Sequence, residues 1–405
     1  MKNIKHFLKE QTEGEGEKLK HIEHLEDLPL NNGEKGLKTS IDALEKVKNH
    51  IKQGRNNSDL TMKHDGSPSL VYGHHPDSGK FFVASKSAFN KTPKINYTDK
   101  DIEENHGHAP GLVEKLKHAL HHLPKIVPDK GVYQGDVLYS GNDVDTHAGK
   151  LNFRPNTIKY STPINSKEGQ KISKSKFGIY THTEYRGKNS ASMNAHFDPD
   201  LSKFKNNPDV YHREPGHDTS KVNLSDADEK EHDSHVNASW KIHIANKDKM
   251  YEPLNKIAKG KEGGKTTVNH ADMMKEYINK TVRTGEKPSV DGLKTHFISK
   301  FGKDIDDTKS PAAKANKSEN LKNNLNHIES NKEHFGNLFQ MHHHLQKAKD
   351  ILVHTLSQHT GGLEHSVNGK KTKPEGFVLN HEGSPIKLND RAEFNRLNFE
   401  RANAR

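Results

Sequence analysis

The four residues Lys63-His64-Asp65-Gly66 carry the strongest chemical signal in the sequence. An unprotonated lysine amine can attack the α-phosphate of ATP and form a phosphoramidate. Because a free lysine has a pKa of about 10.4, such a residue needs a desolvated site beside a metal ion or other cations. Asp65 and Gly66 allow a close backbone turn around a nucleotide, with Asp65 orienting the site or binding the ribose. Taken alone, the tetrapeptide also fits a surface lysine before a tight Asp-Gly turn.

Five short segments follow Lys63 along the chain: Ser85-Lys86-Ser87, Gln134-Gly135-Asp136-Val137, Phe177-Gly178-Ile179-Tyr180, Lys373-Pro374-Glu375-Gly376-Phe377-Val378 and Ile386-Lys387-Leu388. In this order they resemble the motifs of the covalent nucleotidyltransferase superfamily, which holds ATP-dependent DNA and RNA ligases and mRNA capping enzymes. The resemblance covers about residues 15–187 and 365–400. The wider pattern also resembles uncharacterised proteins of large tailed phages.

The resemblance is closest to RNA ligases, whose K-x-D-G-S motif is similar to the stretch from Lys63 to Ser67. It implies that Lys63 is the nucleophile and that Gly66 and Ser67 bind the nucleotide. The implied activity is that of an ATP-dependent polynucleotide ligase. Such an enzyme forms lysyl-AMP, transfers AMP to a 5′-phosphate and joins it to a 3′-hydroxyl, with ATP and Mg²⁺ or Mn²⁺ as cofactors. The expected partner is nucleic acid, with RNA favoured over DNA.

The remaining motif residues have roles that suit their chemical types. Asp136 and Glu375 are carboxylates suited to hold a divalent metal ion and thereby the nucleotide. Lys86 and Lys387 can bind the triphosphate and neutralise the charge that grows on it, a catalytic role. Tyr180 offers a flat face to adenine. Each has a simpler interpretation: surface lysines, a turn carboxylate and a core aromatic residue.

Three positions depart from the family pattern: Asn389 replaces a second lysine, Asp136 stands where glutamate is usual, and Thr61 precedes the nucleophile where RNA ligases often have glutamate. Only residues 388–405 follow the last motif, so no OB-fold is expected there. This weakens the DNA ligase and capping-enzyme interpretations. A nucleotidyltransferase acting on proteins or small molecules, or a degenerate nucleic-acid-binding protein, remain alternatives.

The elements that must position these residues follow from the apolar pattern. Residues 35–52 and 112–123 predict amphipathic helices, and the turn-rich stretch from Gly54 to Asp59 ends the first. Short strands are predicted at residues 69–73, 80–86, 132–139, 177–183, 375–380 and 386–388. The predicted fold class is α+β: an antiparallel-sheet nucleotidyltransferase core, of the ATP-grasp-like ligase adenylation type, with a large helical insertion.

The predicted core comprises residues 1–189 and 361–405, and the predicted insertion comprises residues 190–360. Residues 187–235 are polar and predict long loops. Helices are predicted at about residues 269–283, 290–301, 318–330 and 335–357, with a linker from Thr308 to Ser318. The insertion is expected to be basic and to hold the polynucleotide in place of an OB-fold.

Composition supports a polyanionic partner without proving one. Lys and Arg number 64 against 54 Asp and Glu, a net charge of +10, and only 29% of residues are hydrophobic. There are no cysteines, which excludes disulfides and zinc–thiolate sites. No apolar run approaches the roughly 20 residues of a membrane span, so no membrane partner and a cytoplasmic location (the host cytoplasm for a viral protein) are expected. The 31 histidines, including His342, His343 and His344, are expected on solvated helix faces.

Overall fold

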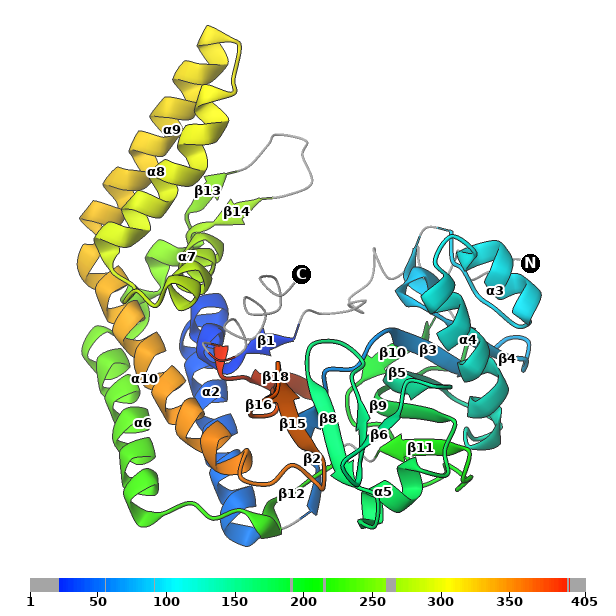
Figure 1. Ribbon diagram of the computed structural model, residues 1–405. Helices are drawn as coiled ribbons and strands as arrows, with labels where there is room; N and C mark the ends of the chain where they lie inside the picture. Colours follow the sequence, from blue (N-terminus) through cyan, green and yellow to red (C-terminus); the bar gives the residue numbers. More distant parts are fainter. Residues whose placement is uncertain are drawn as a thin grey trace. The chain divides into compact units, whose positions relative to one another are not determined.

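The computed structural model describes residues 22–54, 56–90, 92–189, 192–213, 216–259, 267–391 and 393. Its elements form two compact units, each assembled from segments far apart in the sequence (Figure 1). The sheet unit comprises Gln53–Val222 and Leu356–Lys387, and the helical unit comprises Glu23–Lys52, Asn223–Thr355 and the chain from Leu388 onward. The fold class is α+β with several antiparallel sheets, as the sequence predicts.

The units divide the chain at other places than the predicted boundaries, which lie after residues 189 and 360. The sheet unit continues to Val222 and resumes at Leu356. The helix predicted over residues 35–52 is part of α2 (Leu28–Gln53), which kinks at Gly33 and belongs almost wholly to the helical unit. Burial of Leu37, Leu44 and Val47 explains why its apolar stripe was recognisable from the sequence.

The first sheet of the sheet unit joins the early and late parts of the sequence. Its strands follow the order β18-β17-β2-β12. Their bounds are Ser384–Leu388, Gly376–His381, Asn56–Lys63 and Gly216–Asp218. The strands β17 and β18 confirm the two predicted near the C-terminus. The turn predicted from Gly54 to Asp59 is wrong from Asn56 onward, because this polar segment is the start of β2 and pairs with β12.

The second sheet has the order β10-β9-β5-β3-β4, with β11 beside β9 in parallel. The strands β3, β4, β5 and β9 confirm the four predicted in this part of the chain. In chain order the strands are β3 (Ser69–His74), β4 (Phe81–Ala84), β5 (Val132–Ser140), β9 (Phe177–Arg186), β10 (Asn194–His196) and β11 (Val210–Arg213).

The two faces of this second sheet differ. Leu70, Tyr133 and Ile179 point to a core closed by α3 (Asp99–His106) and α4 (Pro110–His122), and Figure 1 shows these helices against the sheet. Alternation along each strand sends the neighbouring residues to the opposite face. Ser69, Asp136 and Tyr180 form one cross-strand row. Each of them is next in sequence to a residue that points into the core, so the row lies on the opposite face.

A third sheet, with the order β16-β15-β8-β7-β6, was not predicted. Its strands are β6 (Asp145–His147), β7 (Lys150–Phe153), β8 (Lys159–Pro163), β15 (Glu364–Val367) and β16 (Lys370–Lys371). They are short and rich in Lys, Ser and Thr, so hydrophobic alternation is weak. The helix α5 (Lys167–Ile172) follows β8.

The helical unit is built mainly from long helices, and the helices predicted near residues 269–283, 290–301, 318–330 and 335–357 are all present. Besides α2, the long helices are α6 (Asp226–Asn246), α7 (His270–Thr284), α8 (Val290–Asp306), α9 (Pro311–Ser330) and α10 (Lys332–Leu356). Two short strands, β13 (Ile257–Lys259) and β14 (Val268–Asn269), pair beside them. None of the described helices combines the length and apolar character that crossing a membrane requires.

Two predictions for this region are wrong. The linker predicted from Thr308 to Ser318 is largely helical, because the Ser310 side chain caps α9 and Pro311 occupies its first turn. The loops predicted over residues 187–235 hold β10, β11, β12 and the first half of α6, which Ser225 caps. α6 escaped prediction because it buries only His232, Val236, Ser239 and His243, a set without an apolar stripe.

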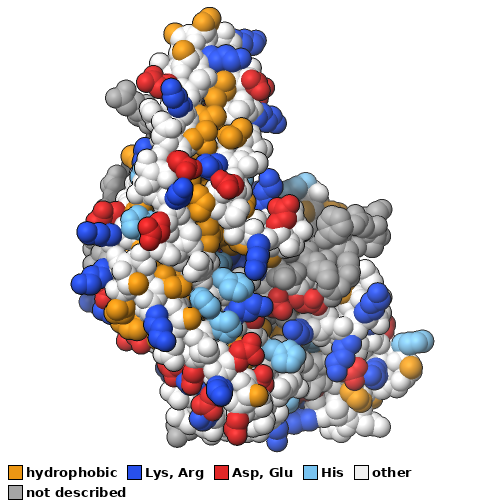
Figure 2. All heavy atoms as spheres, turned by 90° about the vertical axis from the view of Figure 1, so that its left-hand side faces the viewer, with side chains coloured by type: hydrophobic (Ala, Val, Ile, Leu, Met, Phe, Trp, Pro, Cys, Tyr) orange, Lys and Arg blue, Asp and Glu red, His pale blue; other side chains and the backbone are white. Residues whose placement is uncertain are grey.

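The predicted basic insertion is nearly neutral. Residues 190–360 contain 26 Lys and Arg against 24 Asp and Glu. Figure 2 shows the two kinds of charge interspersed on the viewed face of the molecule. The histidine expectation also fails in part, because His342 is buried and its Nε2 lies 3.0 Å from Oδ1 of Asp27.

Candidate functional site

Lys63 and Glu375 meet at the ends of two paired strands. β2 ends at Lys63, β17 begins at Gly376, and these two residues are register partners. Nζ of Lys63 forms an ion pair with Oε1 of Glu375 across 312 residues of sequence. The structure therefore brings together the first and fifth of the sequence motifs.

Lys63 and Glu375 differ in solvent exposure, and the burial of Glu375 affects its pKa. The Lys63 side chain is 32% exposed and that of Glu375 is 6% exposed. Burial raises the pKa of the Glu375 carboxyl, and the nearby charges of Lys63 and Lys387 offset this only in part. Oε2 of Glu375 is buried without a hydrogen-bond partner among the described residues. One carboxylate oxygen thus holds the lysine while the other is free to accept a proton or a cation.

Asp136 lies on the same face of the second sheet as His182, whose Nε2 is 3.4 Å from Oδ1 of Asp136. Burial opposes ionisation, yet His182, Ser69 and Lys63 together hold the pKa of Asp136 below its usual range. Asp136 is therefore an ionised carboxylate that responds to the charge of Lys63.

The carboxylate and the backbone N–H of Asp65 both form hydrogen bonds within the protein. Its carboxylate accepts hydrogen bonds from Nδ2 of Asn156 at 2.7 Å, from the backbone N–H of Thr157 at 2.6 Å and from that of Ile158 at 2.7 Å. Its own N–H donates to the Tyr160 hydroxyl at 2.6 Å. Of the two roles considered for Asp65, this arrangement favours orienting the loop after Lys63 over binding a ribose.

Gly66 and Ser67 pass directly over β5. A Cβ atom on Gly66 would lie 2.6 Å from Cβ of Asp136, so a larger residue does not fit. The backbone N–H of Ser67 donates to the carbonyl of Val137 at 2.9 Å. Because Gly66 has no side chain, the backbone can approach β5 closely at this point. This contact fixes the path of the loop that follows Lys63.

Tyr180 lies in the core rather than at an open surface. It is 3% exposed, and its ring contacts the His64 ring edge-on at 4.8 Å between centroids. Burial raises its pKa, while a hydrogen bond with Thr61 opposes the shift. The structure favours the core interpretation of this residue over stacking on adenine.

The two predicted phosphate-binding lysines have different positions. Lys387, in β18, is half-buried and close enough to Glu375 to lower the pKa of that carboxyl. Lys86 is exposed at the start of a short 3-10 helix (Lys86–Phe89) whose N-terminus Ser85 caps. Within the part of the chain that the structure describes, no hydrogen bond or ion pair joins Lys86 to the other site residues.

The comparisons with known proteins give one positive result. A family model described as a family of unknown function, DUF6267, matches residues 19–403. The chain belongs to the DUF6267 family. It shows no significant match to a curated protein or to a solved structure.

Sequence reasoning missed the buried cluster behind Lys63 in this DUF6267 protein. Nε of Arg213 donates to Nε2 of His64 at 3.0 Å, and its other nitrogens donate to the carbonyls of Thr360 and Gly361. Burial and the Arg213 charge hold the pKa of His64 well below its usual range. Arg213 thereby ties the strand β11 both to the residue after Lys63 and to the segment that leads to Glu375. No motif in the sequence identifies Arg213.

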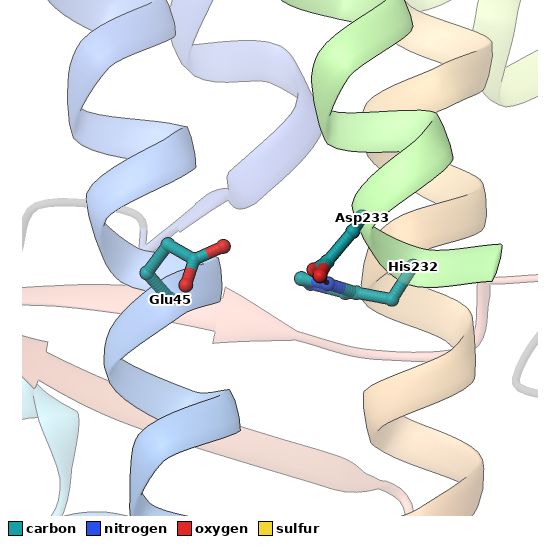
Figure 3. Close-up of side chains that lie close together, drawn as sticks. All are labelled: Glu45, His232 and Asp233. Carbon is teal, nitrogen blue, oxygen red and sulfur yellow. Dashed lines mark hydrogen bonds and ion pairs between the residues drawn. The ribbon is translucent and has the colours of Figure 1, made fainter. Parts of the chain in front are cut away.

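A second group of polar residues, in the helical unit, resembles a metal site but already holds a cation. Glu45 of α2 faces His232 and Asp233 of α6 (Figure 3), and their ligand atoms all lie within 4.8 Å of one another. Nζ of Lys48 lies 2.7 Å from Oδ1 of Asp233 and 2.9 Å from Oε1 of Glu45. Because the ammonium group neutralises both carboxylates, the cluster is better explained as a charged contact between helices.

Proposed function

We propose that this DUF6267 protein is an ATP-dependent nucleotidyltransferase of the nucleic-acid ligase class, with Lys63 as the residue that accepts AMP. The observation that carries the proposal is the pairing of Lys63 with Glu375 at adjoining strand ends. Two motifs that the resemblance assigns to one nucleotide are separated by most of the chain, yet their side chains are in contact. The antiparallel sheets around them support a nucleotidyltransferase core as the finer fold assignment.

The first chemical step joins Nζ of Lys63 to the α-phosphorus of ATP. The bond between the α-phosphorus and the bridging oxygen breaks, and pyrophosphate leaves. Nζ must lose a proton, and Glu375 is its direct partner. Because burial raises the pKa of Glu375, this carboxylate is a stronger base than an exposed one and suited to take that proton. Lys387 supplies positive charge at the same end of the sheet.

A divalent ion fits the oxygen donors of this site. Oε2 of Glu375 is a buried oxygen without a hydrogen-bond partner in the described structure, and Asp136 is an ionised carboxylate on the neighbouring sheet. Oxygen ligands of this type suit Mg²⁺ or Mn²⁺. Glu375 and Asp136 would hold the ion, which when bound shields the charge of the phosphates.

The proposed acceptor is the 5′-phosphate of a polynucleotide, RNA in preference to DNA, followed by joining to a 3′-hydroxyl. This preference rests on the K-x-D-G-S sequence from Lys63 to Ser67. A protein or small-molecule acceptor is a different outcome of the same first step, as is a degenerate site that binds nucleic acid without reacting.

The test is incubation with α-labelled ATP and Mg²⁺ followed by denaturing electrophoresis. We expect a labelled protein band in the wild type and none in Lys63→Ala or Lys63→Arg. Arginine keeps the charge but does not deprotonate in proteins, so it cannot attack phosphorus. Lys130→Arg is the matched control, because Lys130 is an exposed lysine of the same unit, and it should label normally. Labelling of Lys63→Arg at the wild-type rate would require another nucleophile, and no labelling of the wild type would reject the activity.

A further inference from the structure

The third sheet carries a concentration of positive charge at one end, formed by Arg154, Lys159, Lys370 and Lys371, here called the basic end. The 154–158 loop joins β7 to β8; Arg154 is its first residue and Lys159 follows its last. The turn from β15 to β16 lies at the same end, because Ser366 pairs with both Lys159 and Lys371. Four cationic residues at two strand connections thus gather at one edge of a small sheet.

The strand register places two of these lysines in one row. Lys371, Ser366 and Lys159 are successive partners across β16, β15 and β8. Tyr160 and His365, their neighbours along the strands, are buried, so alternation puts the Lys159 row on the outer face. Two lysines separated by one intervening strand are about 10 Å apart at Cα, which suits contacts with separate phosphates of one chain.

The charges of the basic end lack acidic partners among the described residues. Lys150, in the same sheet, by contrast forms an ion pair with Glu364 at 2.7 Å. Arg154, Lys370 and Lys371 are exposed and Lys159 is half-buried. The next cross-strand row runs from Glu364 to Asp145 and is acidic at both ends. The sheet is therefore polarised, with its free positive charge confined to one end.

This end is joined directly to the candidate site. The loop between Arg154 and Lys159 supplies the backbone N–H groups of Thr157 and Ile158 that hold the Asp65 carboxylate. Glu375 follows Lys371 by four residues. A polyanion held at the basic end would lie next to the loop that positions Lys63.

We propose that the basic end of the third sheet binds the phosphate backbone of a single-stranded polynucleotide whose 5′-phosphate reaches Lys63. This rests on the proposed function and adds where its substrate binds. The helical unit is the other candidate, but residues 190–360 carry almost balanced charge, and Figure 2 shows no continuous basic stripe on its viewed face. We therefore place the polynucleotide-binding surface on the sheet unit and not on the predicted insertion.

The experiment measures binding of fluorescein-labelled, 5′-phosphorylated single-stranded RNA by anisotropy over a series of salt concentrations. The test variant is Arg154→Gln/Lys159→Gln/Lys371→Gln, in which glutamine removes charge while keeping much of the side chain. The matched control is Lys303→Gln/Lys309→Gln/Lys322→Gln, three exposed lysines of the helical unit without acidic partners in the described structure. We expect the test variant to bind at least tenfold more weakly. Its salt slope should fall by about 0.7 for each lost phosphate contact.

The outcomes separate this inference from the proposed function, because labelling with α-labelled ATP is measured on the same variants. The test variant should form the Lys63 adduct normally, which also reports that its sheet unit is folded. Normal labelling with unchanged RNA affinity overturns the inference and leaves the proposed function standing. If the control variant binds RNA more weakly than the test variant, the inference is overturned and the RNA-binding surface lies on the helical unit. The same oligonucleotide as DNA tests whether recognition extends beyond phosphates.

Discussion

At the residue scale, what matters around Lys63 is what each carboxylate already holds. Asp65 is saturated by hydrogen bonds from the 154–158 loop, whereas Glu375 uses one oxygen for Lys63 and leaves the other without a partner among the described residues. One residue therefore positions the loop, and the other is free to take part in chemistry. The two can be distinguished because they should affect stability and activity differently.

Asp65→Ala should destabilise the sheet unit and also reduce adduct formation. It leaves the buried N–H groups of Thr157 and Ile158 without an acceptor, a loss on the order of 3 kcal/mol in the free energy of unfolding. Asp65→Asn retains one acceptor oxygen and should lose less. Urea unfolding measured by far-ultraviolet circular dichroism provides the comparison. A stable Asp65→Ala protein would mean that these hydrogen bonds do not hold the loop.

Glu375→Gln should abolish or strongly slow adduct formation without destabilising the fold. Burial raises the pKa of Glu375, so its ionised form is less favoured in the folded state than in the unfolded state. The stability that this carboxyl contributes is present at low pH and is lost as pH rises through its folded-state pKa. Relative to Glu375→Gln, the wild type should therefore be more stable at pH 4, below the ordinary pKa of 4.5, than at pH 8. A variant that labels at the wild-type rate would remove Glu375 from the proton transfer.

The sequence shows the types of these residues but not all their partners. Lys63, Asp136 and Glu375 could be selected because they stand in short motifs, although only Lys63 and Glu375 lie at strand ends and Asp136 lies in the middle of β5. Arg213 could not, because its role depends on three segments meeting in the folded chain. Tyr180 has the right type for stacking on a base, but burial against His64 decides its role.

At the element scale, the length and periodicity of a segment decide whether it can be predicted. α10 was recognisable because Leu338, Leu345 and Leu352 repeat at the helical period and are buried. The third sheet was not, because its strands have two to five residues and pair across distant parts of the sequence. In this sheet, hydrogen bonding to neighbouring strands compensates for the weak strand preference of each segment. A single sequence does not reveal which strands will pair.

α10 also carries a buried ion network that makes a testable contribution to the helical unit. Nζ of Lys349 donates to Glu26 at 2.8 Å, and both side chains are fully buried. Arg391 contacts both Glu26 and Asp27. Burial opposes ionisation of Glu26, but Lys349 and Arg391 outweigh it and hold its pKa well below the usual range.

Lys349→Met should destabilise the helical unit by about 3–5 kcal/mol, because Glu26 would remain buried without its main partner. The double variant Glu26→Gln/Lys349→Met should recover part of this loss. The depressed pKa of Glu26 gives the wild type stability that is present above pH 4.5 and is lost as pH falls through the folded-state pKa. Fluorescence of Trp240 in α6, the single tryptophan, reports unfolding of this unit. Equal stability of the wild type and Lys349→Met would show that the pair is not needed.

At the scale of the whole molecule, the candidate chemistry is confined to one unit. Every residue that the sequence selected, from Lys63 to Lys387, belongs to the sheet unit. The helical unit contributes long helices, nearly balanced charge and the single tryptophan. The two units should therefore respond separately to a nucleotide.

ATP should protect the sheet unit from hydrogen exchange and leave the helical unit unchanged. A ligand that binds only the folded state stabilises it by about 2.7 kcal/mol at one hundred times its dissociation constant. We expect slower exchange in β2, β5 and β17, which carry or adjoin Lys63, Asp136 and Glu375. Lys63→Ala separates reversible binding from the covalent adduct, and hydrogen-exchange mass spectrometry with and without ATP makes the measurement. Protection confined to α6, α7 or α10 would place the nucleotide in the helical unit. Lys63 would then lie in a different unit from the bound nucleotide, and its proposed reaction with ATP would be rejected.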